Sequence, residues 1–503
     1  MRQGMNQDKR YLHDHLDRLW EDVEAFARDG TAVHAVERHL FKALLTLGFE
    51  LLGYFFKQLG DGDQGPQVEA GDGRQLKRLD GLHSRRYRSV FGVFTLSRRV
   101  YAARAKQAQE YVPLDARLQL PEHSFSYLLQ DWAQALAVEF SFEQVGQVLA
   151  KVLGLHAGVS ALERMNRAMA ETVDAYSQQV PVPFQATGDF IVVSADGKGV
   201  PMRKPSEQPP IRAHDGHRGP PVDRKKMAVL GAVYDGQAYV RTPEQVRDAL
   251  FGEPAANDEA RAPRPKPMTK IVRASLSHTD PDGAAINARE VIFPWLGEQV
   301  RQRDPAWQKP VVVLMDGQAC LWTDAEAALG PRPRVEILDL LHATSKLWEV
   351  AHAFHPDGGA LAAMQGYTLW LLRGKVAGLS VLFRHWADSE SLDRATRRKV
   401  ETVCGYFDKH QERMRYHEYL AAGYPIASGV IEGACRHVVK DRLERTGMHW
   451  TVDGAQAMLK LRCVAINEQW DEFTEFRIQR ETRRLYPHTA LYEVEAWPMA
   501  LAA

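Results

Sequence analysis

Apolar residues recur every three or four positions through residues 8–60, which is the spacing of one face of an α-helix. One apolar stripe covers residues 12–26 and a second covers residues 36–55. We therefore expect two helices whose stripes are buried in a core or in a dimer face. Residues 60–75 follow, and their many glycines and aspartates predict a linker.

Aromatic and β-branched residues alternate with arginines through residues 85–102, on both sides of Gly92. This period of two predicts a β-hairpin. The arginines on the hairpin would either keep an exposed strand edge soluble or contact phosphates as a basic ribbon, and both interpretations stay open. These arginines are Arg85, Arg86, Arg88, Arg98 and Arg99.

Helical periodicity returns at residues 124–178. Ser141 is placed to cap a helix that ends at Gly154, and a short turn then leads into a second helix. A helix, a glycine-bearing turn and a helix form the outline of a DNA-binding helix-turn-helix, and also of many ordinary helical hairpins. If this region binds DNA, the second helix would present Arg164 and Arg167 to it.

Between residues 190 and 340 the pattern changes to short apolar runs, with one helix at about residues 283–303. The first run is followed at once by Asp196 and a later run by Asp316, and each of these acids precedes a glycine. Glycine lets a backbone turn close to a ligand, although Asp-Gly is also a common turn dipeptide. The expected strands cover residues 190–195, 227–235, 310–315 and 334–338.

Residues 343–422 are again helical in pattern, and a separate helix is expected at residues 428–445. Glu432 lies in this second helix among apolar and small residues, which favours close packing on a sheet with the acid directed into a site. Glu401 and Glu444 are competing acids, but they lie in strongly charged stretches. Four residues at four-residue steps are expected to share one helix face: Ser428, Glu432, Arg436 and Lys440.

The chain of 503 residues is too long for a single core, and its formal net charge is zero. A nucleic-acid surface must therefore come from clustered basic residues. Four widely spaced cysteines form no CxxC pair, which argues against a zinc knuckle or a disulfide framework. The polar N-terminus and the lack of a run of about 18 apolar residues predict a cytoplasmic protein without a signal peptide or membrane span.

Asp196, Asp316 and Glu432 occupy two strand ends and a helix, a layout that can bring three carboxylates to one pair of divalent ions. Two ions held about 3.5–4 Å apart can activate an attacking oxygen and stabilise a leaving oxygen in phosphodiester chemistry. Hard oxygen ligands select Mg²⁺ or Mn²⁺ over zinc. We therefore expect two Mg²⁺ (or Mn²⁺) ions on these acids.

Asp339 and His342 follow the last expected strand and are three residues apart. If a helix begins there, both side chains can face the same side. His342 would then orient a phosphate or make a supporting contact behind the metal ligands. The alternative is a helix-capping aspartate beside an ordinary histidine.

Several segments of the chain resemble signature segments of bacterial insertion-sequence transposases of the ISKra type, which belong to the DDE superfamily. They are SADGKGVPM at 194–202, VVVLMDGQACLW at 311–322, DLLHATSKLWEVA at 339–351 and YPIASGVIEGACRHVVKDRLERTGMHWT at 424–451. The resemblance implies an α/β ribonuclease-H-like core with a mixed sheet. It also implies that Asp196, Asp316 and Glu432 are the catalytic acids, and that Asp339 and His342 form the motif seen in related Mutator-like and hAT-like transposases.

The same resemblance implies an all-helical insertion before the last catalytic helix, and it leads us to expect six regions. They are an N-terminal helical region at 1–60, a basic β-hairpin region at 76–120, a helix-turn-helix-like region at 121–180, the catalytic core at 185–342 and 424–465, the helical insertion at 343–423, and a C-terminal helical tail at 466–503.

The activity that the resemblance implies is cleavage of a DNA strand at the element ends, followed by attack of the freed 3′-hydroxyl on target DNA. The partners would be the terminal inverted repeats, target DNA and further copies of the chain. Residues expected along the phosphate path are Lys198, Arg436 and Lys440. Trp322 and Trp348 would either stack on a base that is unstacked at the element end or fill the core, which is the commoner role of buried tryptophans. Two other hypotheses remain: a nuclease with the same core, such as a junction resolvase, and a non-catalytic DNA-binding regulator.

Overall fold

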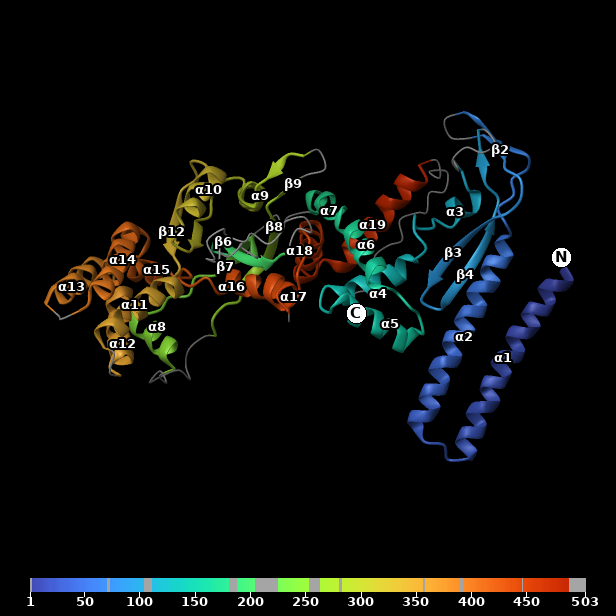
Figure 1. Cartoon of the computed structure of the whole chain (residues 1–503), viewed down its shortest axis with the longest axis horizontal. Coiled ribbons are helices and arrows are strands. Elements are labelled where there is room, and N and C mark those ends of the chain that lie inside the picture. The colour runs from blue at the N-terminus through green and yellow to red at the C-terminus, as the bar shows by residue number, and fades with distance from the viewer. Residues whose placement is uncertain are drawn as a thin grey trace, which may run out of the picture. The chain divides into compact units, whose positions relative to one another are not determined.

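The chain has a mixed α/β fold in two compact units (Figure 1). The first unit comprises Met1–Thr172 and Trp470–Ala503, and the second comprises Val173–Gln469. The C-terminal helix therefore belongs with the N-terminal part of the chain. The computed structural model describes residues 2–69, 73–103, 111–180, 188–203, 225–252, 263–279, 283–355, 358–389, 392–445 and 447–487.

The first unit contains two long helices, two small antiparallel β structures and a group of shorter helices. Its elements are α1 (Arg2–Arg28), α2 (Val33–Leu59), β1 (Gln67–Glu69), β2 (Gln75–Arg78), β3 (His83–Ser89), β4 (Gly92–Arg98), β5 (Tyr101–Ala102), α3 (Pro113–Arg117), α4 (Tyr127–Ala137), α5 (Phe142–Leu153), α6 (Val159–Ala170) and α19 (Trp470–Leu485).

The predicted β-hairpin is confirmed, because β3 and β4 pair in an antiparallel register from His83–Arg98 to Ser89–Gly92. Two of its arginines anchor it to α3. Arg85 and Arg98 both donate to one carboxylate oxygen of Asp115, and all three side chains are largely buried. This buried cluster fixes the hairpin against the chain that follows it.

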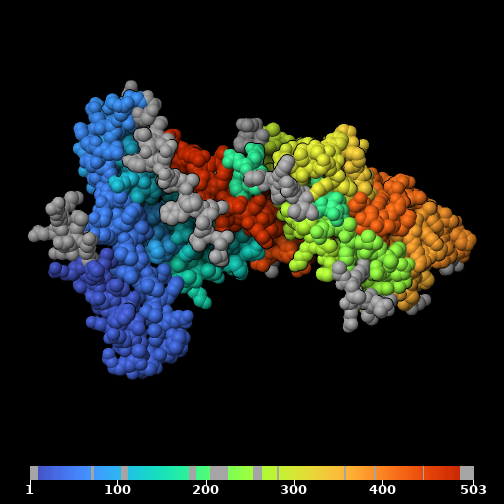
Figure 2. All heavy atoms as spheres, turned by 180° about the vertical axis from the view of Figure 1, so that it is seen from behind, coloured from blue at the N-terminus to red at the C-terminus, as the bar shows by residue number. Residues whose placement is uncertain are grey.

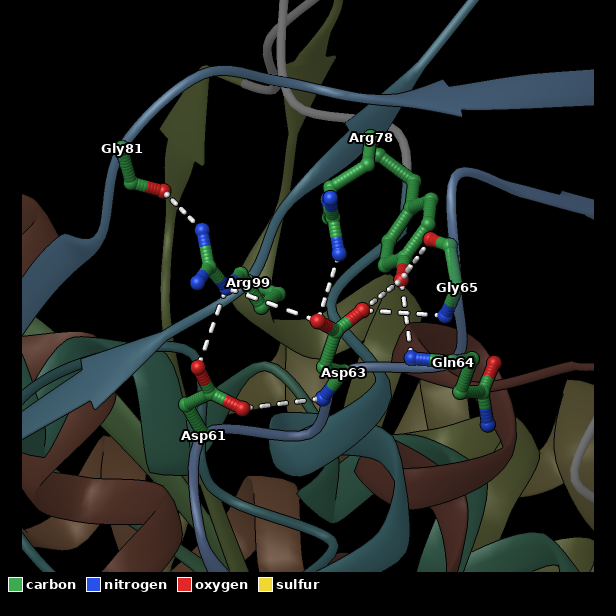
Figure 3. Close-up of polar contacts among 8 residues, drawn as sticks. Asp61, Asp63, Gln64, Gly65, Arg78, Gly81 and Arg99 are labelled. Carbon is green, nitrogen blue, oxygen red and sulfur yellow. Dashed lines mark hydrogen bonds and ion pairs between the residues drawn. The ribbon is translucent and has the colours of Figure 1, made fainter.

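The linker expected at residues 60–75 is wrong for the part that the structure describes. β1 and β2 pair with each other, and β2 pairs with β5. The turn before β1 is held by ionic contacts, shown in Figure 3: Asp63 accepts from Arg78, and Asp61 accepts from Arg99 at 3.0 Å. The polar residues that indicated a linker are thus partners of arginines on β2 and just after β4.

The predicted helix–turn–helix outline is confirmed in α5 and α6. Ser141 caps α5 through the Gln144 N–H, and Gly154 ends the helix with a left-handed backbone (φ 67°). α4 packs against both helices. A buried hydrogen bond of 2.9 Å from Asn166 to Gln134 fixes α6 on α4.

The second unit is built around a five-stranded sheet with helices on its faces and beside it (Figure 1). Its strands are β6 (Phe190–Pro201), β7 (Lys225–Gly236), β8 (Met268–Leu276), β9 (His278–Thr279), β10 (Ala285–Ile286), β11 (Val311–Met315) and β12 (Arg334–Leu338). Its helices are α7 (Val173–Gln179), α8 (Pro243–Phe251), α9 (Ala288–Arg303), α10 (Ala319–Leu329), α11 (Leu340–Phe354), α12 (Ala360–Leu372), α13 (Val376–Ser389), α14 (Arg394–His410), η2 (Gln411–Arg413), α15 (Tyr416–Ala421), α16 (Gly429–Ala434), the π-helix η3 (Cys435–Lys440), α17 (Asp441–Leu443) and α18 (Val452–Ile466).

The strand order in the sheet is β12-β11-β6-β7-β8. β6, β7 and β8 pair antiparallel, whereas β11 pairs in parallel with both β6 and β12. Side chains cover both edges. On β8, the Asn467 side chain bonds both the N–H and the C=O of Val272, and on β12, Tyr416 and Tyr419 donate to strand carbonyls. Covered edges leave few backbone groups free to pair with another chain.

The expectation that the first strand ends before Asp196 is wrong, because β6 continues to Pro201. β7 pairs with it along this whole length, including Gly197 opposite Val229. The turn preference of Asp-Gly is local, and a full ladder of hydrogen bonds to a neighbouring strand overrides it. Asp196 therefore projects from within a strand.

The two faces of the sheet are packed differently. Gly231 on β7 lies under α9, where a Cβ atom would come within 2.7 Å of Ile292. The preceding residue, Leu230, pairs with Asp196 and points to the opposite face, since side chains alternate along a strand. α16 packs on β6 and β7, and η3, which continues it, contacts Asp196 through Cys435. Asp196 therefore lies on the face that α16 and η3 cover.

We predict that Asp115→Ala destabilises the first unit by ~3–5 kcal/mol, because it leaves two buried guanidinium groups without their carboxylate. Urea unfolding followed by circular dichroism would measure the loss. Asp17→Ala, on the exposed side of α1, is the matched control and should leave the free energy of unfolding within about 0.5 kcal/mol of the wild type. Equal stability of the two variants would contradict the prediction.

Candidate active site

Three aspartates lie level with one another at the ends of the parallel pairing. The register joins Ile191 on β6 to Val311 on β11, and Val311 to Arg334 on β12. Counted five residues on, this register reaches Asp196 within β6, and Asp316 and Asp339 directly after β11 and β12. The charges of Asp196 and Asp339 both act to raise the pKa of Asp316, so the three acids are close together.

Asp316 follows β11 directly, as predicted, and is buried. Its carboxylate accepts from the Gln318 N–H at 2.8 Å, and its backbone carbonyl accepts from the indole of Trp322 at 2.9 Å. Burial raises the pKa of Asp316, and the nearby charge of Asp196 raises it further. The glycine after it is required, because a Cβ atom on Gly317 would lie 2.4 Å from the ring of Tyr406.

Asp196 is half-buried and has two short-range contacts. One carboxylate oxygen accepts from the Gly197 N–H at 2.7 Å. The other lies 3.4 Å from Sγ of Cys435, whose thiol donates to it. Burial and the charge of Asp196 raise the pKa of Cys435, so this thiol keeps its proton.

Asp339 connects the end of β12 to the helix that carries Glu432. It caps α11 by accepting from the His342 N–H at 3.1 Å, so the helix-capping part of the alternative interpretation is confirmed, and the supporting role at the site stays a prediction. The same oxygen lies 2.6 Å from Nδ1 of His342, and the other oxygen accepts from the Ser428 N–H at 2.7 Å. Asp339 is fully buried, and its hydrogen bond to the imidazole raises the pKa of His342.

Glu432 lies in α16, one turn after Ser428, and is half-buried. Burial raises its pKa, as does the charge of Asp196, whereas His342 and Lys198 act in the opposite direction. Glu432 is therefore within electrostatic reach of the row of aspartates. Lys198 lies two residues beyond Asp196 on β6 and so projects to the same face.

The helix expected at residues 428–445 is not a regular α-helix throughout, because residues Cys435–Lys440 form a π-helix with i→i+5 hydrogen bonds. That Arg436 and Lys440 share a face with Glu432 stays a prediction. The Arg436 side chain is 71% exposed, and its Nε lies 3.7 Å from Asp441, five residues later. Lys440 is exposed too.

Within the part of the chain that the structure describes, the acids of this site have no arginine partner, unlike several other buried acids. Elsewhere in the second unit, Asp235 is paired with Arg303, and Asp304 with Arg332. Among the described residues, the carboxylates of Asp196, Asp316 and Glu432 form no ion pair. No three His, Cys, Asp or Glu side chains in the described part of the chain are close enough together to hold a metal, so joint ligation requires their side chains to rotate.

Two residues near these acids were not predicted. Tyr406 on α14 is close enough for the charges of Asp316 and Asp339 to contribute to its raised pKa of about 12, although burial is the main cause. Cys435 contacts Asp196. Neither could be found from local pattern, because Tyr406 is distant in sequence and an isolated cysteine resembles any core residue.

The predicted DNA-binding residues lie in different settings. Arg164 on α6 is exposed and Arg167 is half-buried. Arg85 is bound to Asp115 and to the carbonyls of Pro121 and His123, so its donors serve the fold. Arg88 is half-buried and lies over the ring of Phe125.

The two tryptophans that were expected to stack on a base are both packed against protein. Trp322 is buried, with the Arg413 guanidinium 4.3 Å from its ring centre, which agrees with the core-filling alternative. Trp348 is half-buried and stacks on His352 at 5.4 Å.

No model of a known protein family matches the chain, and a search of curated proteins finds no significant match.

We predict that Asp339→Asn lowers the pKa of His342, because the amide replaces a carboxylate bonded to Nδ1. NMR titration would measure the change, with the His342 signal identified by its loss in His342→Gln. Glu349→Gln, an exposed position on the same helix, is the control and should leave this pKa unchanged.

The same contact makes stability depend on pH. A raised folded-state pKa means that the stabilisation is full below about pH 6.5, the unfolded value, and is lost as the pH rises through the folded value. The loss of stability caused by Asp339→Asn should therefore shrink at alkaline pH. A deficit that grows with pH would contradict this assignment.

Proposed function

We propose that the chain is a DNA transposase of an insertion sequence, of the ISKra type within the DDE superfamily. It would cleave DNA strands at the element ends and transfer them into target DNA. The observation that carries the proposal is the proximity of Asp196, within β6, to Asp316, directly after the adjacent parallel strand β11, with Glu432 on the helix that packs on β6 and β7. Two neighbouring strands and a covering helix can supply the three acids that this chemistry needs.

The sheet supports a ribonuclease-H-like core for this enzyme. Three antiparallel strands are followed in the chain by two parallel ones, and the helix with Glu432 comes after a long helical segment. This agrees with the mixed sheet and helical insertion that the sequence resemblance implies. The proposal still takes its function from the site, since one fold can serve many reactions.

The acids suit a pair of Mg²⁺ or Mn²⁺ ions by their chemistry. They are hard oxygen ligands, they are partly buried, and no arginine among the described residues pairs with them. Raised pKa values at Asp316 and Glu432 reflect burial and repulsion from Asp196, and a bound cation would relieve both. Such ions, when bound, activate the attacking oxygen and stabilise the leaving oxygen of a phosphodiester.

The other polar residues near the acids would position Glu432 and help to bind the phosphate. Asp339 holds the start of α16 through Ser428 and so fixes the distance of Glu432 from the sheet. It also orients His342, whose raised pKa favours the cationic form and a hydrogen bond from its Nε2 to a phosphate oxygen. Lys198 adds a second positive charge on the same face.

DNA would also contact the first unit. A hollow of about 760 Å³ there is lined by residues of α6 and α19. Arg164 and Arg480 face it, are exposed, and form no hydrogen bond or ion pair with other described residues. Free arginines beside a helix-turn-helix outline suit a phosphate backbone. The enzyme would act in the cytoplasm, bound to the nucleoid, with further copies of itself on paired ends.

We predict that Asp196→Asn, Asp316→Asn and Glu432→Gln each lower strand cleavage by more than about 100-fold, which exceeds the usual loss for an outer-shell partner of a metal. The substrate is a supercoiled plasmid with the coding region and its flanking DNA, with Mg²⁺ or Ca²⁺ added. Nicks and joined products are read on gels and by sequencing.

Glu401→Gln and Glu444→Gln are the matched controls, because these acids pair with Arg384 and Lys225. Both should keep the wild-type rate. Cleavage without joining would favour a resolvase-type nuclease. Specific DNA binding that survives in all three acid variants of a protein with no nicking activity would favour a regulator.

We also predict that Arg164→Ala and Arg480→Ala each weaken binding to duplex DNA. Each lost phosphate contact should make the plot of log K against log salt concentration shallower by about 0.9. Fluorescence anisotropy at several salt concentrations measures this slope. Arg28→Ala, at the end of α1, is the control, and an equal change in slope for it would argue against the α6–α19 surface.

A further inference from the structure

A hollow of about 380 Å³ lies in the second unit, between the start of β6, the end of β7 and the first residues of α11 and α16. The strands contribute Phe190 and Tyr234 to its lining, and the helices contribute Leu341 and Val430. Its volume is within the range of ligand sites in proteins, which is about 300–1,000 Å³. We call this hollow the β6–α16 groove.

The groove lies on the face of the sheet that carries Asp196. Phe190 stands six residues before Asp196 on β6, and side chains alternate between the two faces of a strand, so both project to the same face. Tyr234 pairs with Val192, two residues after Phe190, and therefore projects to this face as well. Six strand residues span about 20 Å, which is the distance along β6 from Phe190 to Asp196.

Two residues of the groove belong to helices of the candidate active site. Leu341 comes directly before His342 at the start of α11, and its apolar side chain is 39% exposed. Val430 lies two residues before Glu432 in α16. One side of the groove is therefore next to the residues of the site, and the other side is at the start of β6.

The segment that follows β7 is fixed beside the groove by backbone contacts. The Tyr239 N–H donates to the Gly423 carbonyl at 3.0 Å, and the Arg241 N–H donates to the Leu420 carbonyl at 3.3 Å. The Arg241 guanidinium also donates to the Tyr424 carbonyl at 2.8 Å. In Figures 1 and 2, α8, which comes next in the chain and is light green, lies beside the orange helices around α12. The groove is thus preformed by packing.

The lining of the groove carries only positive charge. Arg241, Arg264 and Lys266 line it, and none of the described residues that line it is acidic. Arg264 and Lys266 are exposed and form no hydrogen bond or ion pair with other described residues. Asp189, next to Phe190 in sequence, is outside the lining, and its carboxylate accepts from the Ala238 N–H at 2.8 Å. In a chain without net charge, this is a local site for an anion.

Arg264 and Lys266 are carried by a stiff piece of chain. Prolines stand at positions 263, 265 and 267, so each of the two cations precedes a proline. The proline ring fixes φ, and the residue before a proline is restricted to extended conformations. The two cations are therefore positioned before any ligand binds.

We propose that the β6–α16 groove binds a single strand of DNA, with phosphates on Arg264 and Lys266 and a base against Tyr239 and Leu341. Cations without acids attract a polyanion. The apolar and aromatic side chains between them favour a single strand, because its base faces are free to stack on protein. A duplex keeps its base faces stacked inside and would leave this apolar lining without a contact.

The place of this strand in the reaction rests on the proposed function. A strand cut at the acids would continue along the same face of the sheet into the groove. The distance of about 20 Å corresponds to about six stacked nucleotides at 3.4 Å each, and to fewer in an extended strand. The groove would hold these nucleotides apart from the complementary strand.

The first test measures binding of the full chain to an oligothymidylate of about 12 nucleotides, twice the estimated length. Fluorescence anisotropy is recorded at several salt concentrations, without divalent ions. Each phosphate contact to a single strand contributes about 0.7 to the slope of log K against log salt concentration. Arg264→Ala/Lys266→Ala should therefore lower the slope by about 1.4 on the single strand and leave the slope on duplex DNA unchanged.

Arg394→Ala/Lys399→Ala is the matched control, because it removes the same two charges at exposed positions on α14. It should keep the wild-type slope on both DNAs. An unchanged single-strand slope for Arg264→Ala/Lys266→Ala would overturn the groove as a binding site. An equal change on duplex DNA would overturn the assignment to a single strand.

The second test locates the strand on the wild-type chain and does not depend on the folding of a variant. An oligothymidylate that carries 5-iododeoxyuridine is cross-linked by ultraviolet light, and the linked peptides are identified by mass spectrometry. Tyr239 should be among the linked residues, and its absence would contradict the proposal. Both tests are independent of catalysis. If both succeed and no strand is cleaved, the groove stands and the transposase proposal fails; if cleavage occurs and both fail, only the groove is rejected.

Discussion

The parallel pairing of β6, β11 and β12 is the constraint on which the whole site depends. Side chains alternate between the faces of a strand, so a slip of one residue between β6 and β11 would send Asp316 to the opposite face. Every residue of β11 is buried, from Val311 to Met315. Such a slip would exchange the side chains on the two faces of β11 within a closely packed core. The loss of packing makes the slipped register unfavourable. The position of the acids is therefore set by packing, and hydrogen bonds only refine it.

This position of the acids has an electrostatic cost, because negatively charged carboxylates lie close together. The fold pairs Asp235, Asp304 and Asp115 with arginine, whereas among the described residues Asp196, Asp316 and Glu432 have no such partner. Burial and repulsion together raise the pKa of Asp316 and of Glu432. Local unfavourable electrostatics inside a well-packed sheet are typical of functional sites. The same feature argues against a purely structural role for this cluster.

The sequence pattern correctly predicted the elements whose formation depends mainly on residues close together in the chain. β11 ends before Asp316, β12 covers the expected residues and the β3–β4 hairpin forms, because each has a clear period of two or a continuous apolar run. The failures all involve distant partners. β6 passes through Asp196 because β7 pairs with it, and the expected linker is ordered because Arg78 and Arg99 bind its aspartates. The π-helix at Cys435–Lys440 was not expected either, because it has no sequence pattern of its own.

The helical segment between β12 and α16 is part of the site as well as a connection. Tyr406 packs on the turn after Asp316, and Tyr416 donates to the Leu338 carbonyl at the end of β12. One continuous apolar core joins these helices to the sheet. The chain then reaches Ser428, where Asp339 holds it. The position of Glu432 thus depends on the paired strands and on the helices packed against them. Because the acids are distant in sequence, the site is complete only in the complete second unit.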